Sequence, residues 1–274
     1  IHQKNIIHKD LNSNNILVDF SKKSIRIIDF GMAVNMDLKN QKLESPETLE
    51  GTIAYISPEQ TGRMNRVVDY RSDLYSLGVT FYEIVTGHLP FESQDAAELV
   101  HCHLAKTPLA PHLQENTTFH IPVVISNIIL KLLEKNAENR YQSAQGLRKD
   151  LENCLEQLKK YDKITSIGIG ENDYSGRFQI NQYLYGRSKE KQILMQAFEN
   201  VSKGNNEVVM VGGYSGVGKT ALINEIHKPI TERKGYFISG KFEQLQKNIP
   251  YSAINHAFTE FADILLTESQ EKLT

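Results

Sequence analysis

Several residue types are scarce in this chain of 274 residues, and each scarcity excludes a class of protein. The sequence has no tryptophan and only two cysteines, Cys102 and Cys154. Two cysteines this far apart do not form a disulfide framework, so we expect reduced thiols and not a small secreted scaffold. No apolar run reaches the roughly 18 residues of a membrane span, and the first residues do not follow the pattern of a signal peptide.

An excess of charge of either sign is also absent, because 31 Lys and Arg face 33 Asp and Glu, a formal net charge of −2. Such a balance gives no strong field toward nucleic acid or an anionic membrane. We therefore expect a cytoplasmic protein without a nucleic-acid partner. Hydrophobic residues make up 40% of the chain, which is ordinary for a globular protein. The length predicts about two domains at roughly 100–200 residues each.

The first part of the chain begins with strands and continues with helices. Short β-branched runs between Asn, Ser and Lys predict strands at residues 6–7, 16–18 and 25–28. From about Ser72, apolar residues recur at helical spacing around most of a helix that ends at Gly87 and Pro90, so this helix should be buried. Two amphipathic helices are predicted further on, at residues 125–133 and 147–158.

The second part of the chain has a different pattern of predicted secondary structure. Residues 161–182 lose periodicity and contain several glycines, which predicts a linker between one domain at 1–160 and another at 183–274. Alternation of helix and strand after this linker predicts the start of an α/β domain with a parallel sheet. Its predicted elements are a helix at 193–201, a strand at 208–211, a helix at 222–226 and a strand at 236–238.

Three polar residues near the N-terminus, Asp10, Asn15 and Asp29, are spaced for phosphoryl transfer. That chemistry needs a carboxylate to orient the attacking hydroxyl and accept its proton, and oxygen ligands for magnesium on the phosphates. Asp10 suits the first role, while Asn15 and Asp29 suit the second. Gly31 allows a sharp turn after Asp29. Each of these groups alone would fit a polar turn as well.

The order of the surrounding segments resembles the C-lobe of a serine/threonine protein kinase. The segments that carry this resemblance are His8-Lys9-Asp10, Asp29-Phe30-Gly31, Gly51-Thr52, Tyr55-Ile56-Ser57-Pro58-Glu59, Asp73-Leu74-Tyr75-Ser76-Leu77-Gly78 and Asn139-Arg140-Tyr141. The resemblance implies a mainly helical lobe with short β-hairpins, ATP and Mg²⁺ as cofactors, and a protein substrate with Ser or Thr. Small-molecule phosphotransferases share the Asp…Asn…Asp core but lack the Ser-Pro-Glu and central-helix signatures, so we favour the protein kinase.

The same resemblance implies structural roles for six residues. These are His8, Gly31 and Thr52, an ion pair between Glu59 and Arg140, and Asp73, which would hold the backbone of the catalytic loop. Without that resemblance, Arg140 would be interpreted as a solvated charge, as a lone Arg usually is.

Two departures and one gap qualify this resemblance. Where such kinases have Lys two residues after the catalytic Asp, this chain has Asn12, so charge stabilisation of the transition state would be weaker. Where they have Arg before that Asp, it has Lys9, a point charge and not a bidentate fork. Control by activation-loop phosphorylation is therefore in doubt. The Gly-rich loop, the ATP-binding Lys and its Glu partner do not occur in this sequence, so we expect an internal fragment that is inactive by itself.

A second motif predicts nucleotide binding in the later domain. Residues 213–220 fit the pattern GxxxxGK[ST], in which glycines let backbone N–H groups converge on phosphate oxygens. Lys219 would reach the β and γ phosphates, and the hydroxyl of Thr220 would join the magnesium shell. The predicted nucleotide-binding residues are Gly213, Ser215, Gly216, Val217, Gly218, Lys219 and Thr220.

Gly186-Arg187 with Glu190, before this motif, resembles the start of AAA-like and STAND-like ATPase domains, where the segment packs near the adenine. A charged helix start would look the same. The acidic residue that ATP hydrolysis usually needs at the end of a later strand is not seen, so nucleotide binding is predicted and hydrolysis is left open.

Two weaker patterns have plainer explanations. His101, Cys102, His103, His112 and His120 do not complete a zinc pattern, so we expect surface or groove residues. Tyr174, Tyr183 and Tyr185 are expected to pack between domains.

Taken together, the C-lobe, the Gly-rich linker, Tyr185-Gly186-Arg187 and the P-loop closely resemble bacterial multi-sensor signal-transduction kinases, as do residues 236–242 and 248–252. This resemblance covers essentially the whole chain and implies sensor and histidine-kinase domains in the same polypeptide. Two hypotheses remain. The first is an active Ser/Thr kinase gated by the ATPase domain; the second is a pseudokinase binding module beside a P-loop nucleotide switch or scaffold. The three catalytic residues favour the first, and Asn12 and Lys9 support the second.

Overall fold

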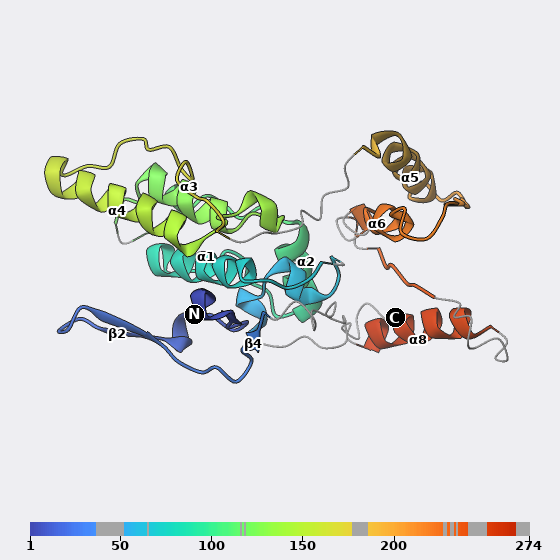
Figure 1. The fold of residues 1–274 in the computed structure, drawn as a ribbon, viewed down its shortest axis with the longest axis horizontal. Coiled ribbons are helices and arrows are strands. Elements are labelled where there is room, and N and C mark those ends of the chain that lie inside the picture. Colours follow the sequence, from blue (N-terminus) through green and yellow to red (C-terminus); the bar gives the residue numbers. More distant parts are fainter. Residues whose placement is uncertain are drawn as a thin grey trace. The chain divides into compact units, whose positions relative to one another are not determined.

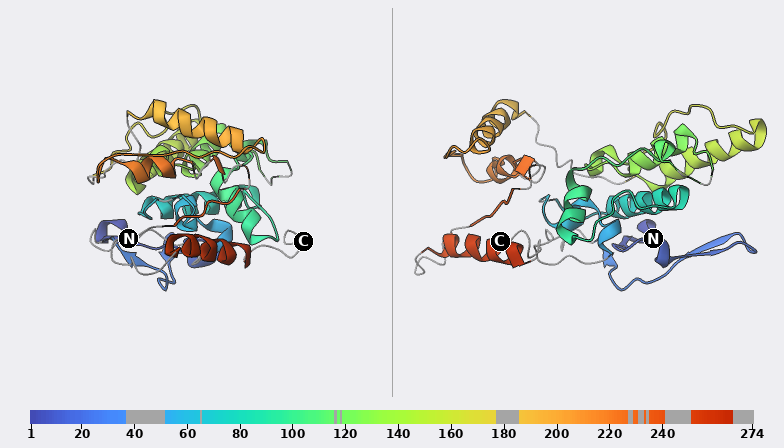
Figure 2. Two further views of the ribbon diagram at one scale, coloured as in Figure 1. Left: turned by 90° about the vertical axis from the view of Figure 1, so that its right-hand side faces the viewer. Right: turned by 180° about the vertical axis from the view of Figure 1, so that it is seen from behind.

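The computed structural model describes residues 1–36, 52–64, 66–115, 117, 119–176, 186–226, 229–230, 233, 235–240 and 251–266. The chain folds as two compact units, residues 1–180 and residues 181–274 (Figure 1 and Figure 2). The first unit contains the segments that suggest a kinase, and the second contains the P-loop motif.

Two short antiparallel pairs of strands open the first unit. β1 (Ile6–Ile7) pairs with β4 (Val34–Asn35). β2 (Ile16–Asp19) pairs with β3 (Ser24–Ile27), and Figure 1 shows this pair as a long blue hairpin. The strands predicted in these three stretches are confirmed to within one residue, since β-branched side chains fit extended backbone.

The central helix is α1 (Arg71–Thr86), which is buried on most of its faces as predicted. Gly78, in its middle, permits close approach of α3 (Val123–Leu132), because a Cβ at Gly78 would lie 2.7 Å from Cβ of Leu132. The helix ends at Gly87, whose φ of 78° is left-handed and suits a residue without Cβ. The fully buried side chains of this helix include Tyr75, Val79 and Tyr82.

α3 and α4 (Ala144–Tyr161) pack on α1 and complete the main core. Both helices are confirmed: α3 begins two residues before its predicted range and ends one residue short of it, and α4 extends three residues beyond its range at each end. Burying one aliphatic core side chain contributes roughly 1.5–3 kcal/mol. The core cluster consists of Leu74, Val124, Ile128, Leu132, Tyr141, Leu147 and Cys154.

α2 (Ala96–Ala105) is not among the helices that the sequence analysis predicts. The carboxylate of Asp95 caps it by accepting a hydrogen bond from Ala97 N at 2.9 Å, and this N-cap is the signal that could have located it. The helix packs against the 3₁₀ helices η3 (Ile53–Tyr55) and η4 (Pro58–Thr61). Further 3₁₀ helices are η1 (His2–Lys4), η2 (Ser13–Asn15), η5 (Pro111–Leu113) and η6 (Ala137–Asn139).

Both cysteines are buried, Cys102 in α2 and Cys154 in α4, and neither forms a disulfide bond, which agrees with the expected lack of a disulfide framework. The segment after α4 differs from the predicted linker at 161–182. Ile164, Ile167 and Ile169 pack against the core cluster of the first unit. Their spacing has neither a helical nor a strand period, so the sequence pattern could not reveal this packing. The domain limits 1–160 and 183–274 stay a prediction.

The described part of the second unit contains α5 (Ser188–Val201), α6 (Lys219–Asn224) and α8 (Ser252–Leu266). α5 and α6 correspond to predicted helices, and α8 does not. The strands predicted at 208–211 and 236–238 pair with no other strand among the described residues, and Val208 and Met210 are 90% and 92% exposed. A parallel strand needs a neighbour for its backbone groups, so the predicted parallel sheet is not seen there. Across the described ranges, we find no helix long and apolar enough to cross a membrane.

Candidate functional site

The loop between β1 and η2 is held by Asp73, near the start of α1. Its buried carboxylate accepts hydrogen bonds from the backbone N–H of His8 and of Lys9, both at 2.9 Å. The side chain of Gln60 donates to the carbonyl of Lys9 at 2.7 Å. These bonds maintain Lys9 at φ 67°, a left-handed conformation that costs a non-glycine residue about 1–3 kcal/mol. Asp73 therefore holds this backbone, as the kinase resemblance implies.

The carboxylate of Asp10 projects from this loop and is oriented by three donors. Oδ1 accepts from the backbone N–H of Thr52 at 2.9 Å and from Nδ2 of Asn12 at 3.2 Å. Oδ2 accepts from Nδ2 of Asn15 at 3.2 Å. Asp10 is half-buried. The three donors restrict the orientation of the carboxylate, as a general base requires.

Asn12 is a neutral bridge between this loop and Thr52. At Oδ1, its buried side chain accepts from the N–H of Asn14 at 3.0 Å and of Asn15 at 3.2 Å, which caps η2. At Nδ2, it donates to Asp10 Oδ1 and to Thr52 Oγ1, each at 3.2 Å. In the sequence, Asn12 is notable only because similar kinases have Lys at this position. The structure shows instead an uncharged residue that connects the Asp10 carboxylate with Thr52.

The hairpin brings Asn15 and Asp29 close along the paired strands. Beyond the end of the β2–β3 pairing, the N–H of Ile28 donates to the carbonyl of Asn15 at 3.0 Å. Asn15 therefore lies beside Ile28, the residue before Asp29. Asp29 itself is exposed and has a left-handed φ of 59°.

His8 and Gly31 support the turn at Asp29. The buried His8 ring donates from Nε2 to the carbonyl of Ile28 at 3.0 Å and packs against Phe30, with centroids 4.8 Å apart. The N–H of Gly31 donates to Asp29 Oδ1 at 3.2 Å. A Cβ at Gly31 would lie only 3.2 Å from that oxygen, so glycine suits this position.

The expected ion pair between Glu59 and Arg140 is present and buried. Nη1 and Nη2 of Arg140 lie 2.7 and 2.8 Å from the two carboxylate oxygens, and Ser72 Oγ donates to Glu59 Oε1 at 2.7 Å. Burial works to raise the pKa of Glu59, but the charge and hydrogen bonds of Arg140 outweigh it and hold that pKa below its usual value. Arg140 also donates to the carbonyl of Arg71 at 3.1 Å, so this pair links η4 to α1.

A second buried polar cluster, which the sequence analysis did not anticipate, lies beside this pair. Nζ of Lys135 donates to the hydroxyl of Tyr75 at 3.3 Å and to the carbonyl of Cys102 at 3.1 Å. Burial, reinforced by the charge of Arg140, lowers the pKa of Lys135 to about 7. Burial and the charge of Lys135 lower the pKa of His103 to about 3.

This cluster corrects the expectation for the histidines near α2. His103 and Cys102 are buried, not at the surface, because α2 packs them against η3 and α1. His112 binds Ser126 Oγ through Nδ1 at 2.8 Å, and His120 is exposed. Within the described ranges, no group of three or more His, Cys, Asp or Glu is placed to hold a metal ion.

The P-loop motif forms a turn before α6 in the second unit. Gly213, Gly216 and Gly218 all have positive φ, at 153°, 81° and 91°, which favours glycine at these positions. Lys219 begins α6, and its Nζ donates to the carbonyls of Gly213 and Tyr214, both at 2.8 Å. The lysine thus lies across the loop, where its ammonium group can exchange these carbonyls for phosphate oxygens.

Arg187 lies next to this loop. Its Nη2 donates to the carbonyl of Val217 at 3.2 Å, and its Nη1 pairs with Glu190 Oε1 at 3.2 Å. The structure therefore places the Gly186-Arg187 segment against the P-loop, as the resemblance to ATPase domains suggests.

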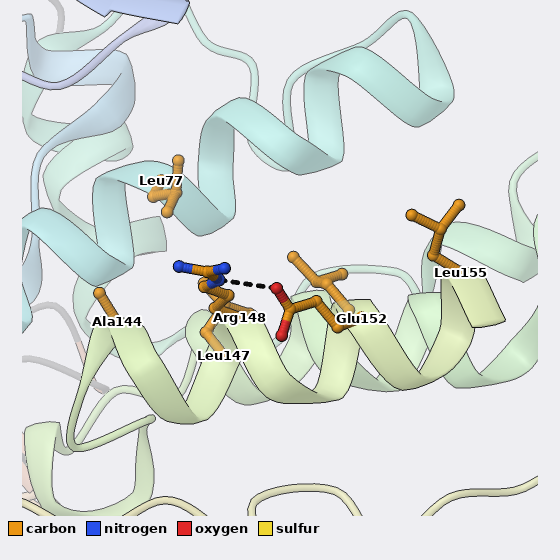
Figure 3. A pocket seen from close by; sticks show the side chains of 7 residues that line it. Leu77, Ala144, Leu147, Arg148, Glu152 and Leu155 are labelled. Carbon is orange, nitrogen blue, oxygen red and sulfur yellow. Dashed lines mark hydrogen bonds and ion pairs between the residues drawn. The ribbon is translucent and has the colours of Figure 1, made fainter.

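An apolar groove runs along α4 beside Leu77 of α1 in the first unit (Figure 3). Its volume is about 300 Å³, and Arg148 and Glu152 pair across one side of it at 2.7 Å. Apart from this exposed pair it presents aliphatic side chains, so we assign it no catalytic part. Its lining residues are Leu77, Ala144, Leu147, Arg148, Leu151, Glu152 and Leu155.

Comparison with known families identifies both units. Residues 1–151, more than half of the chain, match the protein kinase domain. The chain belongs to the protein kinase family. Residues 183–274 match the AAA ATPase domain, so an AAA ATPase domain follows the kinase domain. Both domains are ATP-binding, and the first is a transferase domain.

Several kinases are similar to this chain. Hybrid signal transduction histidine kinase G of Dictyostelium discoideum is 44% identical over 243 residues, covering 81% of this chain and 7% of that protein. Histidine protein kinase 1 of Candida albicans is 28% identical over 274 residues, covering 88% and 11%. Serine/threonine-protein kinase PknB of Mycobacterium tuberculosis is 34% identical over 150 residues, covering 55% and 23%. The chain thus spans less than a quarter of each of these curated relatives, and a bacterial source stays a prediction.

The donors in the kinase domain fit a magnesium–ATP complex. Asn15 uses Nδ2 to bind Asp10, which leaves its amide oxygen as a ligand, and Asp29 offers an exposed carboxylate. Mg²⁺ prefers such oxygens and typically takes one or two from the protein and the rest from phosphates and water. Asn15 and Asp29 would hold it here, where it would neutralise charge on the phosphates. In the AAA ATPase domain, Thr220 would contribute its hydroxyl.

Four predicted features lie wholly or partly outside the described residues. They are Gly51, the pair Tyr183 and Tyr185, residues 241–242 and residues 248–250. Tyr174 is described and is 76% exposed.

Proposed function

We propose that the kinase domain transfers the γ-phosphoryl group of ATP to a serine or threonine hydroxyl of a protein. The observation that carries this proposal is the Asp10 carboxylate, oriented by Thr52, Asn12 and Asn15. Asp10 accepts the hydroxyl proton while the new oxygen–phosphorus bond forms and the bond to the β-phosphate oxygen breaks, which releases ADP. Thr52 directly after Gly51 is typical of serine/threonine kinases and not of tyrosine kinases, and it supports this acceptor class. The relative named a serine/threonine-protein kinase supports it as well.

The AAA ATPase domain, in this proposal, binds nucleotide through Gly213, Ser215, Gly216, Val217, Gly218, Lys219 and Thr220 and regulates transfer. Its strand segments would complete a parallel sheet within the whole protein. The chain would be one part of a cytoplasmic signalling protein whose polypeptide also carries sensor and histidine-kinase domains. The relatives named histidine kinases, of which this chain matches a small share, support that arrangement.

One observation favours a second candidate, a pseudokinase binding module. The bridge from Asp10 to Thr52 is the neutral Asn12, and no cation is among the hydrogen-bond partners of the Asp10 carboxylate in the part of the chain that the structure describes. A hydrogen-bond network without a cation stabilises the transferring phosphate less. In this case the kinase domain would bind a partner, and the P-loop would act as the nucleotide switch.

Phosphate transfer by the full-length protein separates these candidates. With ATP labelled at the γ-phosphate and a Ser/Thr-containing protein as acceptor, Asp10→Asn should lower the rate by roughly 10²–10⁴-fold, the usual contribution of a general base. Asp19→Asn is the matched control, because Asp19 is the last residue of β2 and its carboxylate accepts exposed hydrogen bonds from Ser21 Oγ and Lys22 N. Equal rates for wild type and Asp10→Asn would exclude the active kinase. A wild type without transfer would favour the pseudokinase.

Nucleotide titration tests the P-loop. A fluorescent ATP analogue should bind the full-length protein at two classes of site, and Lys219→Ala should remove one class. Lys203→Ala, at an exposed position of the same unit, should leave both. If Lys219→Ala binds like wild type, the P-loop assignment is wrong.

A further inference from the structure

The segment 164–176, which we call the strap, lies between the two family matches at 1–151 and 183–274. It is therefore a feature of this chain that neither match includes. Ile164, Ile167 and Ile169 anchor its first half on the core between α1, α3 and α4. Burial of such side chains makes the docked position favourable.

Buried polar groups on the kinase domain receive the strap. Asp150, only 1% exposed, accepts from the backbone N–H of Gly170 at 2.8 Å and from the hydroxyl of Tyr141 at 2.6 Å. An internal carboxylate needs such donors, because burial without them would cost several kcal/mol. Part of the hydrogen bonding of Asp150 is thus supplied by the strap.

Asp173 is the second polar anchor. Its Oδ2 accepts from the backbone N–H of Gln142, and its Oδ1 accepts from Ser143 Oγ at 2.8 Å. Ser143 in turn caps α4 by accepting from Gly146 N at 2.9 Å. The carboxylate therefore lies at the N-terminus of α4, where the helix dipole favours negative charge.

Two glycines leave room for the docked strap. A Cβ at Gly146 would lie 2.3 Å from Asp173 Oδ1, which is closer than atoms can approach. Gly170 has φ 78°, and a Cβ there would lie 2.9 Å from Cε of Lys131. The lack of a Cβ at Gly146 of α4 and at Gly170 of the strap therefore permits this contact.

The end of the strap connects, through Tyr70 and His2, to the loop between β1 and η2 that carries Asp10, which we call the catalytic loop. The Tyr70 hydroxyl donates to the carbonyl of Gln142 at 3.0 Å, and Ser175 Oγ lies 3.3 Å from the same hydroxyl. The Tyr70 ring packs against His2, with centroids 5.4 Å apart. His2 Nε2 binds Asp73 Oδ2 at 2.8 Å, and Asp73 holds the catalytic-loop backbone.

We propose that the docked strap, through Asp173, positions the catalytic loop, and that its release lowers phosphoryl transfer. Asp173 is then a positioning residue, acting through Tyr70, His2 and Asp73. The chain continues from the strap toward the AAA ATPase domain, so this arrangement offers a route for regulating transfer. The catalytic part of this proposal rests on the proposed function, whereas the structural part does not.

Hydrogen exchange of the full-length protein measures the structural part without any activity. Asp173→Ala should speed exchange of strap amides, and also of the His8 and Lys9 amides that Asp73 holds, by roughly 10-fold, as loss of about one to two buried hydrogen bonds predicts. Asp173→Asn keeps one acceptor and should have a smaller effect. Glu171→Gln removes the same charge from an exposed position of the strap and should change neither.

Kinetics measure the catalytic part. Asp173→Ala should lower kcat by roughly 3- to 10-fold and leave KM for ATP unchanged. Tyr70→Phe keeps the ring and removes the hydroxyl. In the hydrogen-exchange experiment, it should speed exchange of the His8 and Lys9 amides less than Asp173→Ala does. Should Asp173→Ala unfold the domain, Asp173→Asn decides the matter.

Three results are distinguishable. Faster exchange of the strap with unchanged His8 and Lys9 amides and unchanged kcat would mean that the strap is purely structural. Unchanged exchange of the strap would mean that Asp173 does not hold it. Either of these first two results overturns the proposal. A wild type without transfer refutes the proposed function alone, and the exchange of His8 and Lys9 still decides the strap.

Discussion

The guanidinium of Arg140 forms two parallel hydrogen bonds with the carboxylate of Glu59, at 2.7 and 2.8 Å, and their side chains are 0% and 4% exposed. Removing one partner leaves an uncompensated buried charge, so Arg140→Ala should lower the free energy of unfolding by about 3–5 kcal/mol. Denaturant unfolding of the chain measures this. The pair Arg148–Glu152 is the matched control, since it is exposed and Arg148→Ala should cost below about 1 kcal/mol. Similar losses for both variants would contradict the role of burial.

The same pair predicts a pH dependence. The pKa of Glu59 is lowered in the folded state from an ordinary value of 4.5, so the unfolded state binds its proton first on acidification. The stabilisation is therefore complete above that ordinary value and is lost as pH falls through the lowered folded value. The difference in unfolding free energy between wild type and Glu59→Gln should narrow as the pH falls below the ordinary value of 4.5. A difference that stays constant with pH would show that the pKa of Glu59 is the same in the folded and the unfolded state.

Lys135 should destabilise the fold at neutral pH, whereas the ion pair of Glu59 and Arg140 stabilises it. Its folded pKa of about 7 lies below the ordinary value of 10.5, so between these values the unfolded state binds more protons and stability rises with pH. Lys135→Met removes the buried charge, while the Cys102 carbonyl keeps its bond to Lys106 N. The variant should be more stable at neutral pH by on the order of 1 kcal/mol, with the gain shrinking at about pH 10. Thermal unfolding at both pH values checks this, and a gain independent of pH would contradict it.

The bridge formed by Asn12 should matter for transfer if Asp10 is the base. Asn12→Ala removes the donor to Asp10 and Thr52 and should lower kcat by roughly 10-fold, the effect of one to two lost hydrogen bonds. Asn12→Asp should lower it further, because a second carboxylate beside Asp10 adds negative charge next to the transferring phosphate. Asn14→Asp, exposed on the same η2 helix, is the control. Full activity of Asn12→Asp would show that this bridge is dispensable.

Replacing Gly78 by alanine should destabilise the protein, although alanine has the higher helix propensity. Alanine in a helix interior usually gains about 1 kcal/mol over glycine. A Cβ at Gly78, however, would lie 2.7 Å from Cβ of Leu132 on α3, and such overpacking costs about 1–3 kcal/mol. Gly78→Ala should therefore destabilise the first unit in denaturant unfolding. A stabilised variant would mean that α3 can move away from α1 at little cost.

The elements that the sequence predicts correctly depend on local patterns. β-branched runs and turn residues located β1, β2 and β3, and apolar spacing located α1, α3 and α4. α2 escaped notice because its only clear local signal is the cap at Asp95. The strands predicted beside the P-loop stay a prediction, because a parallel strand depends on partners that its own residues do not specify.

For the candidate site, the sequence alone predicted which residues would carry the chemistry, because Asp10, Asn15 and Asp29 have the order and spacing typical of protein kinases. Only the tertiary structure decided what surrounds them. It placed Asn12 between Asp10 and Thr52, buried His103 beside Lys135, and docked the strap on the core. The physical reason is that these contacts join residues far apart in the chain, where burial and hydrogen-bond geometry, not local periodicity, select the partner.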